Sequence, residues 1–265
     1  NAGNIDKDWA HLMNEAKNFD VKLTNVSDKY AAIAVQGPES KKILMTLSGG
    51  RQLTPENVKN ALNSLTMEGK PVRIAKTGYT GEPIGYELYC NSEDARYFWD
   101  RLIELGAKPT ALGARDTTRM EAALPLYGHE MGECEMGGEI QIYAVPLAKF
   151  AVSFDEAKGD FIGREPLRKQ FEALKKIMNR DYSSIEDLPY RIQPIYLEGK
   201  GVLRKGFPIY CKDAWAEGKQ IGYVTSGTMI PYYKTEGQGL ESVFTDETGK
   251  RSIGLAYMDS RICQD

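Results

Sequence analysis

The sequence predicts an α+β protein that ends in a small β-barrel domain, and three observations lead to this prediction. Strand and helix patterns are mixed, with several hairpin turns, as far as about residue 150. A polar stretch at 179–189 ends in proline, which is typical of a connection. Beyond it, short strand patterns separated by turn residues suit a small barrel or sandwich. We therefore expect an α+β region over residues 1–180 and a β-barrel-like domain over residues 190–265.

Helical and alternating apolar spacings define the expected elements of the first region. In chain order we expect a helix over 6–19, strands over 21–26 and 30–37, a helix between Gly37-Pro38 and Gly49-Gly50, strands over 62–67, 72–77 and 84–90, and helices over 92–105 and 111–124. Pro38 suits the first turn of a helix, because an N–H at that position would have no partner within the helix.

The second half of the chain has a simpler pattern. A charged helix is expected over 165–178. It is followed by four short strands, expected over 191–197, 207–211, 220–225 and 253–258.

Composition narrows the possible classes of function. The 265 residues include 34 Lys+Arg and 37 Asp+Glu, which gives a formal net charge of −3, and 42 % of the residues are hydrophobic. This balance is that of a globular protein, and it disfavours both disorder and nucleic-acid binding through bulk positive charge. All apolar runs are shorter than the roughly 18–20 residues that span a bilayer. We therefore expect neither a nucleic-acid partner nor a membrane partner.

The cysteines and histidines bear on compartment and metal binding. The four cysteines are far apart and form no CxxC pair, so we interpret them as free thiols of a cytoplasmic protein. The chain has only two histidines, His11 and His129. A multi-histidine metal site is therefore not expected.

The segment from Lys76 to Tyr89 carries the first candidate residues. Gly78-Tyr79-Thr80-Gly81 is a turn, and Glu87 follows in the next strand. Strand alternation places Glu87 on the face opposite Tyr86 and Leu88. Such a carboxylate is either a solvated hairpin residue or a ligand contact. As a ligand contact it could accept two parallel N–H bonds, which suits the edge of an amino-heterocycle.

A second candidate group lies on the expected helix over 111–124. Arg115 and Arg119 share one helix face at i,i+4. They are either surface residues with salt bridges, or Arg115 presents its fork of donors to a ligand. His129 follows a glycine in a loop, where a packing or hydrogen-bonding role is more usual than that of a base.

Two segments of the last region contain further residues of interest. Arg204 lies in a loop before an expected strand, and Ser226 lies in a Ser-Gly-Thr turn after another. Ser226 has no base adjacent to it in the sequence, and the Gly-x-Ser-x-Gly elbow is absent. Walker A and Gly-x-Gly-x-x-Gly patterns are absent as well.

Taken in order, several short motifs resemble the aminomethyltransferase family, the T-protein of the glycine cleavage system. The motifs are Asn1-Ala2-Gly3, Gln36-Gly37-Pro38, Gly78-Tyr79-Thr80-Gly81-Glu82, Gly85-Tyr86-Glu87, Gly113-Ala114-Arg115-Asp116, Leu124-Pro125-Leu126-Tyr127-Gly128-His129, Asp160-Phe161-Ile162-Gly163-Arg164-Glu165 and Val224-Thr225-Ser226-Gly227. Each is short, but the whole series extends over most of the chain.

The resemblance implies a fold, a reaction and a set of site residues. The family transfers a one-carbon unit from an aminomethyl group on the lipoyl arm of H-protein to tetrahydrofolate and releases ammonia. It has three domains around a channel that holds the folate. By this resemblance Glu87 pairs with the amino-pyrimidine edge of the pterin, Tyr79 lines the pocket and Arg115 orients the folate. Asn1 corresponds to a pocket-edge residue, and Arg204 to one near the channel mouth.

This chain also departs from the family pattern. The family's chain starts before its Asn-Ala-Gly motif, and the catalytic Asp lies in that earlier stretch. The family also continues beyond the strand that matches 253–258, and the segments 136–151 and 232–249 fit its pattern poorly. We therefore expect a fragment of a divergent member that is inactive by itself. A folate-dependent demethylase, a non-enzymatic folate-binding relative and a structural domain without a ligand remain alternatives.

Overall fold

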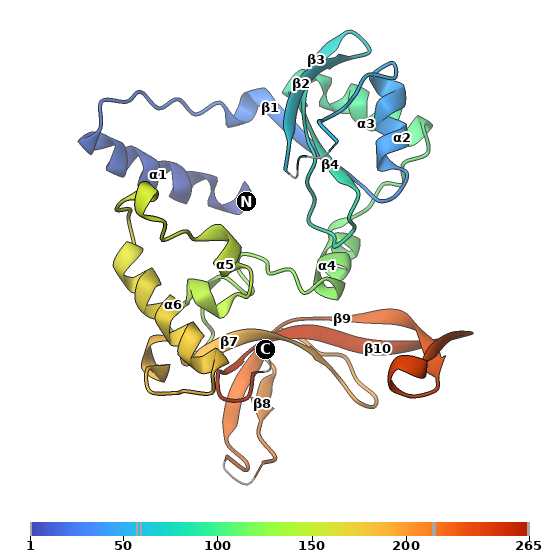
Figure 1. The fold of residues 1–265 in the computed structure, drawn as a ribbon. Helices are drawn as coiled ribbons and strands as arrows, with labels where there is room; N and C mark the ends of the chain where they lie inside the picture. Colours follow the sequence, from blue (N-terminus) through green and yellow to red (C-terminus); the bar gives the residue numbers. More distant parts are fainter. Residues whose placement is uncertain (1, 57, 59, 214–215, 264–265) are drawn as a thin grey trace. The chain divides into compact units, whose positions relative to one another are not determined.

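The computed structural model describes residues 2–56, 58, 60–213 and 216–263, and the chain divides into two compact units, Asn1–Leu112 and Gly113–Asp265. Both units combine helices with antiparallel sheets (Figure 1), which confirms the predicted α+β class. Within the described residues, no helix has both the length and the apolar character that crossing a bilayer requires.

The first unit is built on a four-stranded antiparallel sheet in the order β1-β4-β3-β2. Its strands are β1 (Tyr30–Gln36), β2 (Leu62–Met67), β3 (Lys70–Ala75) and β4 (Gly85–Asn91). The β2–β3 hairpin has a two-residue loop in which Glu68 (φ 46°) and Gly69 (φ 81°) are both left-handed. This backbone matches the right-handed twist of the strands and fixes their register.

Helices α2 (Ser40–Leu47) and α3 (Ala95–Glu104) pack against one face of this sheet. The apolar residues of that face and of both helices form a single core, which consists of Val35, Ile43, Leu44, Leu47, Leu53, Met67, Val72, Ile74, Tyr86, Leu88, Cys90, Phe98 and Leu102. The opposite side chains of the strands therefore lie on the face away from this core.

The chain before β1 differs in part from the prediction. Helix α1 (Ile5–Glu15) confirms the expected helix and is extended by a 3₁₀ turn, but none of its residues is buried. The strand expected over 21–26 is wrong, because this segment is irregular. Its apolar residues stay exposed, with Val21 at 58 %, and an alternating pattern makes a strand only where a neighbouring strand pairs with it.

The second unit contains helix α4 (Leu112–Glu121), which starts at the division between the units, a short β5 (Gly132–Glu133) and β6 (Glu139–Ile140) pair, α5 (Ala148–Ala151) and α6 (Arg164–Met178). Its main sheet is antiparallel in the order β7-β10-β9-β8. The strands are β7 (Tyr190–Tyr196), β8 (Pro208–Tyr210), β9 (Gln220–Glu236) and β10 (Val243–Asp259). Among the described residues β7 and β8 are the edges of this sheet, and a closed barrel stays a prediction.

Short 3₁₀ turns complete the two units. In chain order they are η1 (Ala2–Asn4), η2 (Ala16–Asn18), η3 (Ser27–Lys29), η4 (Ser92–Asp94), η5 (Ile142–Ala144), η6 (Glu156–Lys158), η7 (Ile185–Asp187) and η8 (Gly239–Glu241).

The division between the units differs from the boundary expected near 180–190. Ala173 and Ile177 of α6 pack in the same core as Ile192 of β7 and Leu255 of β10. The stretch 179–189 is therefore a connection within one core, and the chain divides between Leu112 and Gly113 instead. Polar composition predicts a turn, whereas shared burial decides which segments belong together.

Strands β9 and β10 are 17 residues each and pair along most of their length as one long hairpin (Figure 1). The expected strands over 220–225 and 253–258 are its buried halves. The outer halves over 229–236 and 243–250 are mostly exposed, so they lack the apolar pattern that marks a strand in a sequence. The segment 232–249 that fits the family pattern poorly forms the far end of this hairpin.

Candidate functional site

Strand β4 places Glu87 on the face of the first sheet that carries no helix core. Tyr86 and Leu88, on either side of it, are 3 % and 0 % exposed in the core, whereas Glu87 is half-buried. The alternation inferred from the sequence is thus confirmed. The side chain of Glu87 is positioned by a regular strand, which holds it more firmly than a loop would.

The carboxylate of Glu87 is oriented by a neighbour on the same face. Tyr89 Oη donates a 2.6 Å hydrogen bond to Glu87 Oε2. This bond to a carboxylate, together with partial burial, raises the pKa of Tyr89 to about 12. Tyr89 therefore remains a neutral donor throughout the physiological range. One lone pair of Oε2 is used, and the rest of the carboxylate can accept further N–H donors.

Small residues flank Glu87 across the sheet. Its register partners are Ala34 on β1 and Ala75 on β3. Residues directly opposite one another share a face, so methyl groups border the carboxylate on both sides.

The turn that carries Tyr79 belongs to the 76–84 loop between β3 and β4. Backbone bonds fix both of its ends, from Lys76 N to Ala61 O at 2.9 Å and from Gly37 N to Ile84 O at 2.9 Å. Tyr79 is half-buried within this loop. Glu87 and Tyr79 therefore belong to adjoining segments of one unit.

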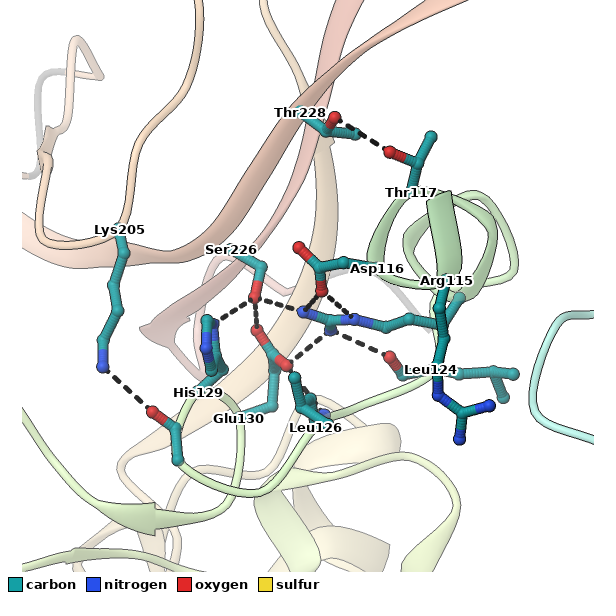
Figure 2. Close-up of polar contacts among 12 residues, drawn as sticks. Arg115, Asp116, Thr117, Leu124, Leu126, His129, Glu130, Lys205, Ser226 and Thr228 are labelled. Atoms are coloured by element: carbon teal, nitrogen blue, oxygen red, sulfur yellow. Dashed lines mark hydrogen bonds and ion pairs between the residues drawn. The ribbon is translucent and has the colours of Figure 1, made fainter. Parts of the chain in front are cut away.

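The second unit contains a buried polar network that centres on Arg119 of α4. Figure 2 labels its partners Asp116, Leu124, Glu130 and Ser226. Arg119 is 2 % exposed, and its five N–H groups all have partners. Nε and Nη2 contact Asp116 Oδ1 at 2.8 and 2.6 Å, Nη1 donates to Leu124 O at 3.0 Å and to Glu130 Oε2 at 2.7 Å, and Nη2 donates to Ser226 Oγ at 2.8 Å. A buried guanidinium is tolerable only when it is paired and hydrogen-bonded in this way.

Glu130 is the matching anion at the centre of the network. It is fully buried, accepts from Leu126 N at 2.9 Å, and accepts from Ser226 Oγ at 2.6 Å. His129 Nδ1 lies 3.1 Å from the same Ser226 Oγ. Because Ser226 has a single proton and gives it to Glu130, His129 Nδ1 must carry the hydrogen of the third contact.

This arrangement decides between the possible roles of Ser226 and His129. Ser226 is 2 % exposed and its oxygen is engaged by Arg119, Glu130 and His129, so it is not available as a nucleophile. The hydrogen-bonding role inferred for His129 is confirmed. The network joins α4, the 124–130 segment and β9, and a Thr117–Thr228 contact of 3.2 Å adds a second link between α4 and β9.

A bulge in β9 aims Ser226 at this network. Leu255 of β10 pairs with Ser226, and Ala256 pairs with Val224, so Thr225 is the extra residue. A bulge changes the direction in which the following side chain points, and its position follows from pairing with β10.

The sequence-predicted site residues are distributed over both units. Arg115, in the first turns of α4, is exposed and points away from the Arg119 network (Figure 2). Arg204 is exposed in the loop before β8, where the sequence placed it, and its neighbour Lys205 donates to Gly128 O at 2.9 Å. Asn1 lies outside the described residues. Glu87 and Tyr79 thus belong to the first unit, and Arg115 and Arg204 to the second.

One interpretation from the sequence requires correction. The alternative in which Arg115 and Arg119 are both surface residues with salt bridges is wrong for Arg119, because only Arg115 is exposed. The partners of Arg119 lie up to 107 positions away in the chain, so the residues next to Arg119 in the sequence do not predict that it is buried. The nearest available hint was Asp116, three positions before Arg119, which can pair with it on a helix.

Within the described residues, no group of three or more His, Cys, Asp or Glu side chains is arranged to hold a metal ion. All four cysteines are free thiols.

Comparisons with known proteins identify the family of this chain and its fold. Residues 1–144 match the family described as GCVT N-terminal domain. The whole chain is 35 % identical to an aminomethyltransferase of Caldanaerobacter subterraneus subsp. tengcongensis, and 98 % of it is 38 % identical to that of Halalkalibacterium halodurans. The crystal structure of glycine cleavage system aminomethyltransferase T from Bartonella henselae matches 98 % of this chain with a TM-score of 0.65 at 22 % identity. The chain spans about 60 % of the length of these relatives, and 59 % of that structure.

Proposed function

This chain belongs to the aminomethyltransferase family, and on that premise we propose that the protein transfers the one-carbon unit of a lipoyl-bound aminomethyl group, presented by H-protein, to tetrahydrofolate with release of ammonia. Tetrahydrofolate is the acceptor substrate in this proposal, and H-protein is the partner that delivers the donor. Because the chain spans about 60 % of the length of its relatives, the activity of the whole protein is part of the proposal.

The observation that carries the proposal is the position of Glu87. A strand residue with a charged side chain is held at the face opposite the core, oriented by Tyr89 and bordered by Ala34 and Ala75. The amino-pyrimidine edge of a pterin offers two parallel N–H donors, and a carboxylate is the group that accepts such a pair best. Glu87 and its neighbours therefore fit tetrahydrofolate, the acceptor that the family suggests.

The other site residues have supporting roles in the proposal. Tyr79 lines the pterin pocket from the 76–84 loop. Arg115 is exposed on α4 and keeps its fork of donors available for the folate. Arg204 lies near the mouth of the folate channel, and Asn1 is a pocket-edge residue.

The chemistry requires positioning and charge stabilisation. Two folate nitrogens form bonds to the methylene carbon in succession, while its bond to the amine breaks to release ammonia and its bond to sulfur breaks to leave the reduced lipoyl arm. Positive charge develops on the transferred group between these steps. A preorganised carboxylate stabilises such a charge in a dry site. In the family that role belongs to an aspartate, so Glu87 is proposed as the anchor of the pterin and not as the catalytic group.

Tetrahydrofolate binding and turnover test the proposal in two steps. The protein is titrated with tetrahydrofolate by calorimetry, with Glu87→Gln as the variant and Glu93→Gln, exposed in η4, as the matched control. Formation of methylene-tetrahydrofolate is then measured with aminomethylated H-protein. Absence of folate binding contradicts the proposal. Binding with demethylation of a methylated donor indicates a demethylase instead, and binding without turnover of any donor indicates a non-enzymatic folate-binding protein.

The expectation that the 265-residue chain is inactive by itself stays a prediction. The same assay on this chain tests it, because measurable methylene-tetrahydrofolate formation contradicts it.

A further inference from the structure

The side chain of Gln36, the last residue of β1, lies in a narrow slot between two glycines. Its Nε2 donates to Tyr86 O at 2.9 Å and to Thr77 O at 3.3 Å. A Cβ atom added at Gly78 would lie 1.9 Å from Gln36 Oε1, and one added at Gly85 would lie 2.1 Å from it. Side-chain atoms never approach so closely, so both positions must lack a side chain while Gln36 keeps this conformation.

Backbone conformation does not explain these two glycines. Neither Gly78 nor Gly85 has a positive φ, unlike Gly81 in the same loop at 80°. Neither position therefore requires glycine for a left-handed backbone. For Gly78 and for Gly85 alike, the three nearest atoms to an added Cβ all belong to the Gln36 side chain. The Gln36 side chain is therefore what excludes a side chain from these two positions while it keeps this conformation.

The slot lies at the base of the 76–84 loop, which carries Tyr79. Thr77 O belongs to the first part of this loop, and Tyr86 O belongs to the strand into which it leads. One amide group of β1 thus contacts both the first part of the loop and the strand that follows the loop. The Oε1 atom of Gln36 is buried without a hydrogen-bond partner among the described residues, so the amide costs desolvation energy that an apolar side chain would avoid. The two hydrogen bonds that Gln36 Nε2 donates offset this desolvation cost.

We propose that Gln36 is a positioning residue that fixes the 76–84 loop, and with it Tyr79, relative to β4, the strand that bears Glu87. The identity of the ligand in this inference rests on the proposed function. The claim that Gln36 fixes the loop rests only on the contacts of Gln36, Gly78 and Gly85.

A double-mutant cycle between Gln36 and Gly78 tests the contact. Gln36→Ala, Gly78→Ala and the double variant are compared with the wild-type protein by hydrogen exchange at the amides of Lys76 and Gly37, which donate to Ala61 O and Ile84 O and so hold the two ends of the loop. Each single substitution should speed exchange of the loop by about five- to tenfold, the equivalent of one hydrogen bond. The double variant should exchange no faster than Gln36→Ala alone, because an alanine at 78 then has no side chain to displace.

Two references separate local from global effects. Exchange at core amides of β4 reports loss of the whole fold, and it should stay unchanged. Gln141→Ala is the matched control, since Gln141 is also a half-buried amide that donates to a backbone carbonyl, Asp187 O at 2.8 Å, and belongs to the second unit. It should leave loop exchange unchanged. Unchanged loop exchange in Gln36→Ala, or a Gly78→Ala effect of the same size in both backgrounds, overturns the inference.

Tetrahydrofolate affinity distinguishes failure of the inference from failure of the proposed function. In Gln36→Ala the Kd for tetrahydrofolate should rise by about five- to tenfold, as the loop loosens, with the KM for aminomethylated H-protein unchanged. Faster loop exchange with an unchanged folate Kd overturns the positioning role. A wild-type protein that binds no tetrahydrofolate refutes the proposed function, and the exchange cycle then decides alone whether Gln36 fixes the loop.

Discussion

Arg119 Nη2 donates a 2.8 Å hydrogen bond to Ser226 Oγ, although 107 positions separate the two residues in the chain. This bond joins α4 to the bulged part of β9 through a network in which Arg119 and Glu130 are both buried. Two buried charges stabilise a fold only while both are present, because each compensates the desolvation of the other. The network is therefore expected to control the stability of the second unit.

Glu130→Gln should destabilise the protein strongly. The substitution leaves the buried guanidinium of Arg119 with Asp116 as its remaining anion, and one Gln N–H group would face the donors that Glu130 now accepts. Breaking a buried pair from one side costs about 3–5 kcal/mol of the free energy of unfolding. Urea denaturation, followed by a probe in the second unit, measures this loss.

Arg96→Ala is the control for this measurement. Arg96 and Asp100 form an exposed i,i+4 ion pair on α3, and such pairs contribute about 0.3–0.5 kcal/mol. Similar losses in Arg96→Ala and Glu130→Gln would contradict the central role of the buried network.

Arg115 and Arg119 should respond in opposite ways to the same substitution. Lysine keeps the charge but lacks the planar fork of donors. At exposed Arg115, Lys should lower the turnover of the whole protein and change the free energy of unfolding by less than about 0.5 kcal/mol. At buried Arg119, Lys cannot replace five N–H contacts, so it should lower the stability instead. Turnover assays and denaturation curves of both variants check this contrast, and equal turnover in Arg115→Lys and wild type would favour a surface role for Arg115.

Glu87→Gln should weaken tetrahydrofolate binding without unfolding the first unit. Gln offers one acceptor where the pterin edge presents two donors, and its NH₂ group would oppose one of them. Loss of a charged bidentate contact costs roughly 1.5–3 kcal/mol of binding free energy. Calorimetric titration measures the change, and an unchanged Kd would refute the assignment of Glu87.

The hydrogen bond between Tyr89 and Glu87 predicts a pH dependence at alkaline pH. The pKa of Tyr89 is raised to about 12, above its value of about 10 in an unfolded chain, so the folded state holds this proton more tightly. The stability that Tyr89 contributes is fully present below pH 10 and is lost as the pH rises towards 12. The difference in unfolding free energy between wild type and Tyr89→Phe should therefore be constant below about pH 10 and shrink above it. A difference that shrinks already between pH 8 and pH 10 would contradict the bond.

His129 should exist as the tautomer that carries hydrogen on Nδ1. Ser226 gives its only proton to Glu130, so the Nδ1 contact requires a donor on the ring. Nitrogen chemical shifts of His129 at neutral pH distinguish the two tautomers. Ser226→Ala removes the acceptor and should shift the His129 signals, whereas those of His11 should stay unchanged. A wild-type ring with hydrogen on Nε2 alone would contradict the proposed direction of the bond.

Local pattern by itself determined the elements that have a buried face. Tyr30–Gln36, Leu62–Met67 and the β4 residues from Gly85 were predictable, because alternate side chains enter the core and mark the strand. The same alternation placed Glu87 on the face opposite the core, and the motif series led to the family. These features depend on neighbours within a few positions, and a sequence displays them directly.

Tertiary structure decided the features that depend on distant partners. The segment 21–26 has a strand pattern but no neighbour to pair with, whereas the outer parts of β9 and β10 lack the pattern and form strands because each pairs with the other. The burial of Arg119 required Glu130 and Ser226 to meet it, and the slot of Gln36 required Gly78 and Gly85. A buried charge or a close approach is stable only when several separate segments supply its surroundings at once, and no local stretch of sequence specifies that coincidence.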